Sequence, residues 1–212
     1  MLLEYISSKD LSVYLERPLE VQGAVMAMPF INTSAAQQAA GLMSSRAGAP
    51  GMVLAIHDSS EQGFGALVNA AFKATKSNYF GYVAQDAYAG RQWLKLAIDA
   101  LGQNKSFLGF NDGKWAGALA GFGLAKRSWA QENYGGEFFH PGYQRHYADA
   151  ELTLLALQAG LYAYDANSVL IEVDWDKDQA GVDPADRAFF AKRKQGRFDG
   201  RVTSKPLLDL IT

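Results

Sequence analysis

Short, unbroken runs of apolar residues alternate along this chain with longer segments of helical periodicity. The apolar runs cover residues 23–30, 52–56, 79–84 and 168–173. Strands that are buried on both faces read as continuous apolar runs, and they occur in parallel sheets that helices cover on both sides. The pattern therefore predicts an α/β domain with a mostly parallel sheet.

The segments between the apolar runs carry helix signals. The expected helices are residues 35–46, 64–76, 92–101 and 149–160. The polar residues 32–34 offer N-caps for the first helix, and Gly160 is the expected stop of the last. Residues 107–136 are rich in glycine and aromatic residues, and Asn111-Asp112-Gly113 predicts a hairpin with a tight turn there.

Composition limits the classes of protein that this chain can belong to. Of its 212 residues, 49% are hydrophobic, which is enough for one sizeable core. The formal net charge of -2 argues against a protein dominated by binding to nucleic-acid phosphates. Cysteine is absent, which excludes disulfides, thiolate metal sites and a cysteine nucleophile. We expect a lead-in at residues 1–22, one domain at 23–175 and a polar, basic extension packed on it at 176–212.

The apolar runs are too short to cross a bilayer, which needs roughly 20 residues. Charged residues such as Glu4 and Lys9 stand where a signal peptide would be apolar. We therefore expect a cytoplasmic protein that is at most peripheral to a membrane and is not an integral membrane protein. A basic cluster near the C-terminus is expected either to be solvated surface or to bind an anionic group. Its members are Lys192, Arg193, Lys194, Arg197 and Arg201.

Acidic and polar side chains follow the apolar runs. Asn32 follows the first run, Asp58 the second, Asp86 the third and Asp174 the fourth, while Asp149 begins a helix. Ligands of open α/β sheets bind beyond the carboxyl ends of the strands, so we expect these groups to converge. A carboxylate rim suits Mg²⁺ or Mn²⁺. Each acid taken alone also fits a helix cap or a turn.

Several segments follow one another in an order that is more specific than any of them alone. They are Pro29-Phe30-Ile31-Asn32, His57-Asp58-Ser59-Ser60, Gly65 to Asn69, Ala84-Gln85-Asp86 with Trp93-Leu94, and Tyr147 to Gly160. In this order they resemble the motifs of the GT-A type glycosyltransferases, in particular the inverting, family-2-like group. The D-x-D motif of that group is reduced here to Ala84-Gln85-Asp86, which has one carboxylate. The resemblance runs from about residue 23 to about residue 175.

The resemblance implies a GT-A-like three-layer α/β/α sandwich with a mostly parallel central sheet. It also implies transfer of a sugar from a nucleoside diphosphate sugar to a hydroxyl of an acceptor, with inversion at the anomeric carbon. The acceptor is open: a glycan, a lipid-linked molecule or another hydroxyl compound. No general nucleic-acid binding is expected.

The resemblance assigns a role to each candidate site residue. Asp149 is the general base, and Glu151 is a second candidate that we expect to be exposed to solvent. Asp86 and Asp174 are the predicted ligands of Mn²⁺ or Mg²⁺. The predicted nucleotide-binding residues are Pro29, Asn32, Asp58 and Asn69.

Two other functions stay open at this point. A degenerate member of the same group would bind a nucleotide or sugar without transferring it. A nucleotidyltransferase-like α/β enzyme would also gather acids at strand ends, but it would release pyrophosphate. An interaction module is the least favoured, because the apolar strands direct polar groups toward one edge of the sheet.

Some aromatic residues are expected either to belong to the core or to stack on sugar rings. They are Trp115, Trp129, Phe138, Phe139 and Tyr143.

Overall fold

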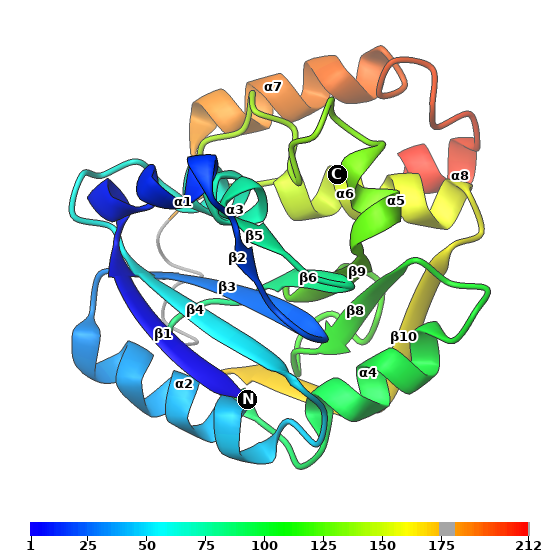
Figure 1. Ribbon diagram of the computed structural model, residues 1–212. Coiled ribbons are helices and arrows are strands. Elements are labelled where there is room, and N and C mark those ends of the chain that lie inside the picture. The colour runs from blue at the N-terminus through cyan, green and yellow to red at the C-terminus, as the bar shows by residue number, and fades with distance from the viewer. Residues whose placement is uncertain (174–180, 212) are drawn as a thin grey trace.

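The computed structural model describes residues 1–173 and 181–211, and an eight-stranded sheet runs through its centre (Figure 1). The strands of this sheet are β1 (Leu2–Ser7), β3 (Ala24–Phe30), β4 (Gly51–His57), β6 (Tyr79–Tyr82), β7 (Ala87–Ala89), β8 (Phe107–Asn111), β9 (Gly123–Lys126) and β10 (Tyr162–Glu172). Their order across the sheet is β1-β4-β3-β6-β9-β8-β10-β7. Two short strands, β2 (Leu19–Glu20) and β5 (Thr75–Lys76), pair separately.

Most strands of the sheet are parallel. β1, β4, β3 and β6 pair in parallel, as do β8 and β10, whereas β9 and β7 run antiparallel to their neighbours. The central strand β3 is buried along its whole length, because neighbours pair with it on both sides and helices cover both faces. The mostly parallel sheet predicted from the apolar runs is thereby confirmed.

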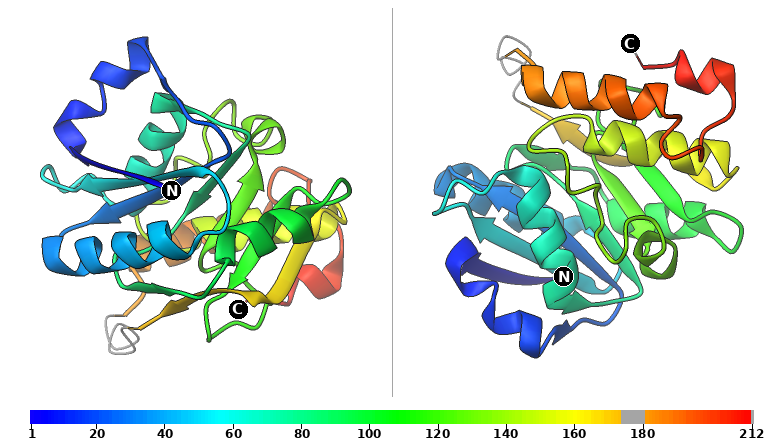
Figure 2. Two further views of the ribbon diagram at one scale, coloured as in Figure 1. Left: turned by 60° about the horizontal axis from the view of Figure 1, so that its bottom comes forward. Right: turned by 90° about the horizontal axis from the view of Figure 1, so that it is seen from above.

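Helices cover both faces of the sheet. On one face lie α2 (Thr33–Arg46) and α4 (Trp93–Leu101), and on the other lie α3 (Phe64–Ala74), α5 (Arg127–Gln131) and α6 (Ala148–Gln158). The helix α7 (Pro184–Gln195) lies outside α6, as Figure 2 shows from above. Shorter elements are α1 (Val13–Glu16), α8 (Lys205–Leu208) and a 3-10 turn at Ser8–Asp10. The three-layer α/β/α sandwich is confirmed.

Alternate residues of β3 serve two separate cores, one on each face of the sheet. Val25 and Ala27 pack with the residues of α3 and α6, whereas Met26 and Met28 pack with those of α2 and α4. This follows from the two-residue period of a strand, which points successive side chains to opposite faces. Asn32 lies between β3 and α2 and is the N-cap of α2, where its Oδ1 accepts a hydrogen bond from the Ala35 N–H at 3.1 Å.

The structure differs from the sequence predictions at the edge strand β1 and at the connection between β8 and β9. Residues 2–7 of the expected lead-in form the edge strand β1, which pairs in parallel with β4. Strands β8 and β9 are antiparallel as a hairpin requires, but a long loop at residues 112–122 joins them in place of a tight turn. Among the described residues, no helix is long and apolar enough to cross a membrane.

Candidate functional site

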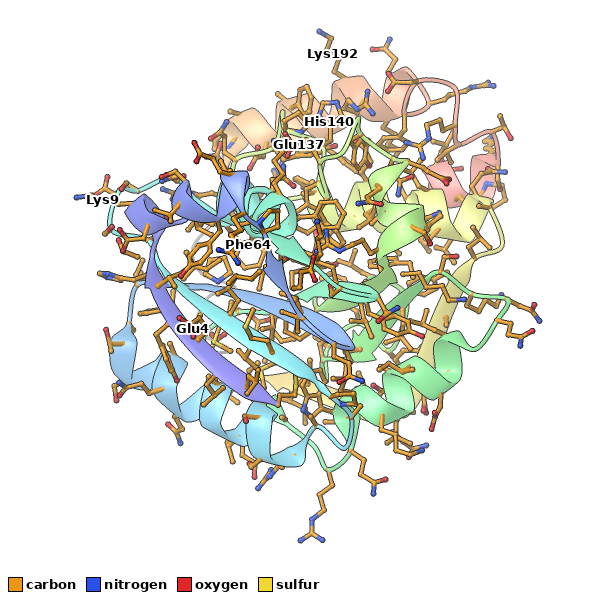
Figure 3. The ribbon with its side chains drawn as sticks, viewed as in Figure 1. Glu4, Lys9, Phe64, Glu137, His140 and Lys192 are labelled. Atoms are coloured by element: carbon orange, nitrogen blue, oxygen red, sulfur yellow. The ribbon has the colours of Figure 1, made fainter. Side chains whose placement is uncertain are left out.

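A cavity of about 630 Å³ opens beyond the carboxyl ends of β6, β8 and β10. Acidic residues from three different elements line it: Asp112, Asp149 and Glu172. Aromatic side chains form much of the remaining wall. They include Phe64 at the start of α3 (labelled in Figure 3), Tyr82, Trp115, Phe139 and Tyr143. This edge of a parallel sheet is where the ligands of open α/β folds bind.

Asp149 is the second residue of α6, and it brings a carboxyl group into the cavity wall. Its Oδ1 accepts a hydrogen bond from the Ala150 N–H at 2.9 Å. Burial raises the pKa of Asp149 to about 6. Backbone hydrogen bonds lower it in part, and the charges of Asp112 and Glu172 add a smaller upward shift. A carboxylate with such a pKa is ionised at neutral pH and is still basic enough to accept a proton.

The sequence analysis missed two acids of this site, Asp112 and Glu172. Asp112 is 3% exposed, and its Oδ1 accepts hydrogen bonds at 2.9 Å from the N–H groups of both Lys114 and Trp115. The Glu172 N–H donates to the Asp112 carbonyl at 3.2 Å, which ties the ends of β8 and β10 together. Asp112 directly follows a strand, as the other candidate acids do, but the Asp-Gly pair suggested only a turn.

The other predicted acids lie away from this cavity. Asp58 binds the loop before α3: its two carboxylate oxygens accept hydrogen bonds from the Gln62 and Gly63 N–H groups at 2.9 and 3.0 Å. Asp86 lines a separate pocket of about 260 Å³ between α2 and β7. Neither is among the residues that line the cavity of Asp149. Asp174 lies outside the described residues, so the predicted roles of all three stay predictions.

The predicted nucleotide-binding residues of the first strand are close to the reduced D-x-D motif. Pro29 is buried within β3. The N–H groups of Ile31 and Asn32 both donate to Gln85 Oε1, at 2.9 and 2.8 Å. The middle residue of Ala84-Gln85-Asp86 thus fixes the turn between β3 and α2, and Ala84 itself lines the main cavity.

Asn69 is buried in α3 and holds the loop that follows α5. Its Oδ1 accepts from the N–H groups of Phe138 and Phe139 at 3.1 and 2.7 Å, and its amide nitrogen donates to the Phe139 carbonyl at 3.0 Å. Through these bonds Asn69 has a structural role: it fixes the backbone of Phe139, whose side chain lines the cavity. A role in nucleotide binding stays a prediction.

Replacing Asn69 with alanine is expected to destabilise the protein. Asn69→Ala leaves three buried backbone groups at residues 138 and 139 without this partner, and we expect the free energy of unfolding to fall by about 2–3 kcal/mol. Urea denaturation of both proteins measures the difference. An unchanged unfolding midpoint with weakened nucleotide affinity would instead assign Asn69 to ligand binding alone.

Glu151 is fully buried, so the expectation of an exposed second base is wrong. Arg193 of α7 binds both of its carboxylate oxygens, with distances of 2.6 Å from Nη2 to Oε1 and 3.1 Å from Nε to Oε2. The hydroxyls of Tyr134 and Tyr143 donate to the same carboxylate at 3.1 and 2.7 Å. With four hydrogen bonds on its two oxygens, Glu151 serves as a structural anchor between α6 and α7.

The residues that the structure describes do not supply an evident metal site. Within residues 1–173 and 181–211, no group of three His, Asp or Glu side chains is arranged to hold a metal ion. Asp112, Asp149 and Glu172 share the cavity without forming such a group. A cation bound among the described residues would therefore have fewer than three acidic or histidine ligands from the protein.

Solved structures show which fold this architecture belongs to, although no family model and no curated protein matches the sequence. The mannosyltransferase PcManGT from Pyrobaculum calidifontis, solved with GDP-Man and Mn²⁺, is 14% identical. The match covers 95% of this chain and 74% of that one, with a TM-score of 0.55. Glucosyl-3-phosphoglycerate synthase from Mycobacterium tuberculosis, solved with Mn²⁺ and UDP-Glc, is 11% identical, with coverages of 97% and 89% and a TM-score of 0.54.

The chain has the GT-A fold. The resemblance drawn from the collinear motifs is confirmed at this level, because both matches extend well beyond the segments that carried it. Within this GT-A fold, the segment after β6 carries Ala84-Gln85-Asp86, and α6 brings Asp149 to the cavity. Sequence identities this low establish the fold alone.

Proposed function

We propose that this protein transfers a sugar from a nucleoside diphosphate sugar to a hydroxyl group of an acceptor. The observation that carries the proposal is Asp149: a carboxyl group with a raised pKa in the wall of a 630 Å³ cavity at the carboxyl edge of a GT-A sheet. The solved structures that share this fold include proteins bound to GDP-Man and to UDP-Glc, which supports a donor of the same chemical class.

In the proposed reaction, Asp149 accepts the proton of the acceptor hydroxyl. The hydroxyl oxygen forms a bond to the anomeric carbon while the bond from that carbon to the diphosphate breaks, and the bonding electrons leave with the diphosphate. Because Oδ1 of Asp149 accepts the Ala150 N–H, we assign the proton to Oδ2. In-line attack of this kind inverts the anomeric configuration, which NMR of the product would show.

The aromatic wall of the cavity fits a sugar ring. Trp115 is 42% exposed and stands beside Asp112, and Phe64 and Tyr147 line the same space. Sugar rings pack their apolar C–H faces on aromatic side chains, while carboxylates accept hydrogen bonds from their hydroxyls. The combination of Trp115 with Asp112 and Glu172 therefore suits a polyhydroxylated ligand.

Metal assistance is a separate part of the proposal and no step above depends on it. The predicted ligands are Asp86 and Asp174, and the cation is Mn²⁺ or Mg²⁺, which would neutralise the diphosphate. We expect Asp86→Asn to raise the Mn²⁺ concentration needed for half-maximal transfer about tenfold. An unchanged requirement in a manganese titration would remove Asp86 from the metal site.

The experiment for the main proposal is a donor screen with product identification. The protein is incubated with UDP-, GDP-, ADP- and dTDP-sugars and a set of hydroxyl acceptors, and released phosphates are measured. Release of nucleoside diphosphate with a matching glycoside supports sugar transfer. Release of pyrophosphate would instead identify a nucleotidyltransferase.

One observation favours a second candidate, a protein that binds nucleotide or sugar without transfer. Ala84 lines the cavity at the first position of the reduced D-x-D motif, where the resembled group has a carboxylate. Calorimetry with UDP and GDP, with and without Mn²⁺, separates the two functions. Binding without turnover or hydrolysis in the donor screen would favour this candidate.

The pH dependence of transfer follows from the pKa of Asp149. The base works as a carboxylate, so the rate is expected to rise with pH and to level off above an inflection near pH 6, where Asp149 has lost its proton. Tyr82 faces the same group, but burial raises its pKa well above the ordinary value, so it stays protonated throughout. A kcat that stays constant between pH 4.5 and 8.5 would contradict this assignment.

A further inference from the structure

Helix α7 binds the chain segment that delivers Asp149 to the cavity. Asp186 of α7 is 1% exposed, and its carboxylate accepts hydrogen bonds from three successive backbone N–H groups, at residues 144, 145 and 146. The three distances are 2.9, 2.7 and 2.8 Å. Hydrogen bonds from N–H groups to a charged carboxylate are among the stronger ones in proteins. Asp186 therefore fixes the backbone immediately before α6.

The N-cap residue of α6 has an unusual backbone conformation. Tyr147 has a φ of +68°, in the left-handed region that non-glycine residues rarely adopt. Its ring stacks on Phe190 of α7, with a centroid distance of 4.6 Å and an angle of 15° between the planes. Such a conformation costs about 1 kcal/mol or more and persists when its surroundings hold it in place. Phe190 therefore helps to hold the conformation of Tyr147, which lies two residues before Asp149.

A third contact joins α7 to a residue of α6 itself. Arg193 binds Glu151, two residues after Asp149, through both carboxylate oxygens. Asp186, Phe190 and Arg193 are spaced by four and three residues, which places them on one face of α7. Lys192, by contrast, points away from the molecule into solvent (Figure 3). One face of α7 thus contacts residues on both sides of Asp149 in the chain.

We infer that α7 is a positioning element for the proposed base: Asp186, Phe190 and Arg193 fix residues 144–151 so that the Asp149 carboxyl group faces the cavity. The inference rests on the proposed function for its kinetic consequences, but the contacts can be tested without turnover. The same segment, residues 143–150, lines the cavity continuously, so a shift of its backbone moves the wall that bears Asp149. Misplacement of a reacting group by about 1 Å can lower a rate about 100-fold.

The first test is Asp186→Asn, which keeps the shape of the side chain. Asparagine has one acceptor oxygen in place of two, so at least one of the three N–H groups loses its bond. We expect kcat to fall about 10- to 100-fold. The Kd for nucleoside diphosphate should stay within about threefold, because the predicted nucleotide-binding residues lie on β3, at the N-cap of α2, directly after β4 and on α3, outside residues 144–151. Phe190→Leu, a milder variant, is expected to lower kcat about 3- to 10-fold by removing the stacking on Tyr147.

The matched control is Arg187→Gln, which changes an exposed residue directly after Asp186 and should leave kcat unchanged. Amide hydrogen exchange gives a readout that needs no substrate. In Asp186→Asn, exchange at residues 144–147 is expected to be about tenfold faster or more, whereas the protection of β3 stays at the wild-type level. Faster exchange together with an unchanged kcat would overturn the inference.

The design separates failure of this inference from failure of the proposed function. If the wild-type protein transfers no sugar in the donor screen, the proposed function fails. The inference is then decided by carbon-13 NMR titration of the Asp149 carboxyl group. An Asp149 pKa that moves toward its ordinary value in Asp186→Asn supports the inference, because the loosened segment admits water. Identical titration and exchange in the two proteins overturn it.

Discussion

Asp149→Asn is expected to lower kcat for sugar transfer by about 10²- to 10⁴-fold, the range that general-base catalysis contributes. Asparagine has nearly the shape of aspartate, and its Oδ1 can still accept the Ala150 N–H. The variant cannot accept the acceptor's proton, however. Nucleotide affinity is expected to change less than threefold, as calorimetry would show. Transfer at the wild-type rate would refute the assigned base.

The same substitution is expected to stabilise the protein at pH 8. The pKa of Asp149 is about 6 in the folded protein, above its ordinary 3.8, so the folded state prefers the protonated, uncharged form. Stability is therefore lost as the pH rises from about 4 to about 6, where the carboxyl group ionises in its buried position. Removing the charge should recover roughly 1–3 kcal/mol at pH 8 and nothing at pH 3.5.

Urea denaturation of Asp149→Asn and the wild-type protein at these two pH values measures this effect. The two proteins differ in this one ionisable group, so the comparison isolates the effect of the Asp149 charge. A stabilised but inactive variant is the combination expected of a catalytic acid or base. A variant that is destabilised at both pH values would show that the carboxylate serves the fold instead.

Arg193→Gln is expected to lower the free energy of unfolding by about 3–5 kcal/mol, the usual cost of leaving one partner of a buried ion pair uncompensated. Glu151 is fully buried, and Arg193 is its cationic partner at 2.6 Å. The tyrosine hydroxyls of Tyr134 and Tyr143 remain, but they cannot neutralise the charge. The hydrogen bonds to Glu151 also hold the pKa of Arg193 above its ordinary value.

An exposed pair within α4 provides the control. Lys95 and Asp99 lie 2.6 Å apart, and their side chains are 50% and 57% exposed. Lys95→Ala should change stability by less than about 0.5 kcal/mol, because water screens such pairs. The double variant Glu151→Gln/Arg193→Gln should recover part of the loss, since it removes both charges. Equal unfolding midpoints for Arg193→Gln and Lys95→Ala would contradict a stabilising role of the buried Glu151–Arg193 pair.

The candidate site shows where sequence reasoning succeeded and where it did not. Asp149 was assigned from its position at a helix start within a collinear set of motifs, and it lines the main cavity. Asp112 was missed because an Asp-Gly pair is ordinarily a turn signal, and here the same residue both forms a turn and lines the cavity. Asp58 and Asp86 follow strands as expected, yet their side chains serve a loop and a separate pocket.

The expectation for Glu151 failed for a related reason. A glutamate in the first turn of a helix is most often solvated. The helix dipole favours a negative charge at this position, so no buried partner is needed to account for the residue. Burial of Glu151 requires Arg193, which lies 42 residues later and belongs to a segment that the sequence marks only as polar and basic. The pattern of charges in the sequence does not show which basic side chains are buried against a carboxylate.

The sequence by itself determined the parallel sheet, its covering helices and the helix start that bears Asp149. These features depend on local order: unbroken apolar runs can be buried on both faces only in a strand that helices cover, and a polar cap such as Asn32 acts on the residues next to it. The tertiary structure decided which acids share the cavity and how α7 holds α6. Those contacts join residues far apart in the chain, and they depend on the packing of whole elements, which no short stretch of sequence encodes.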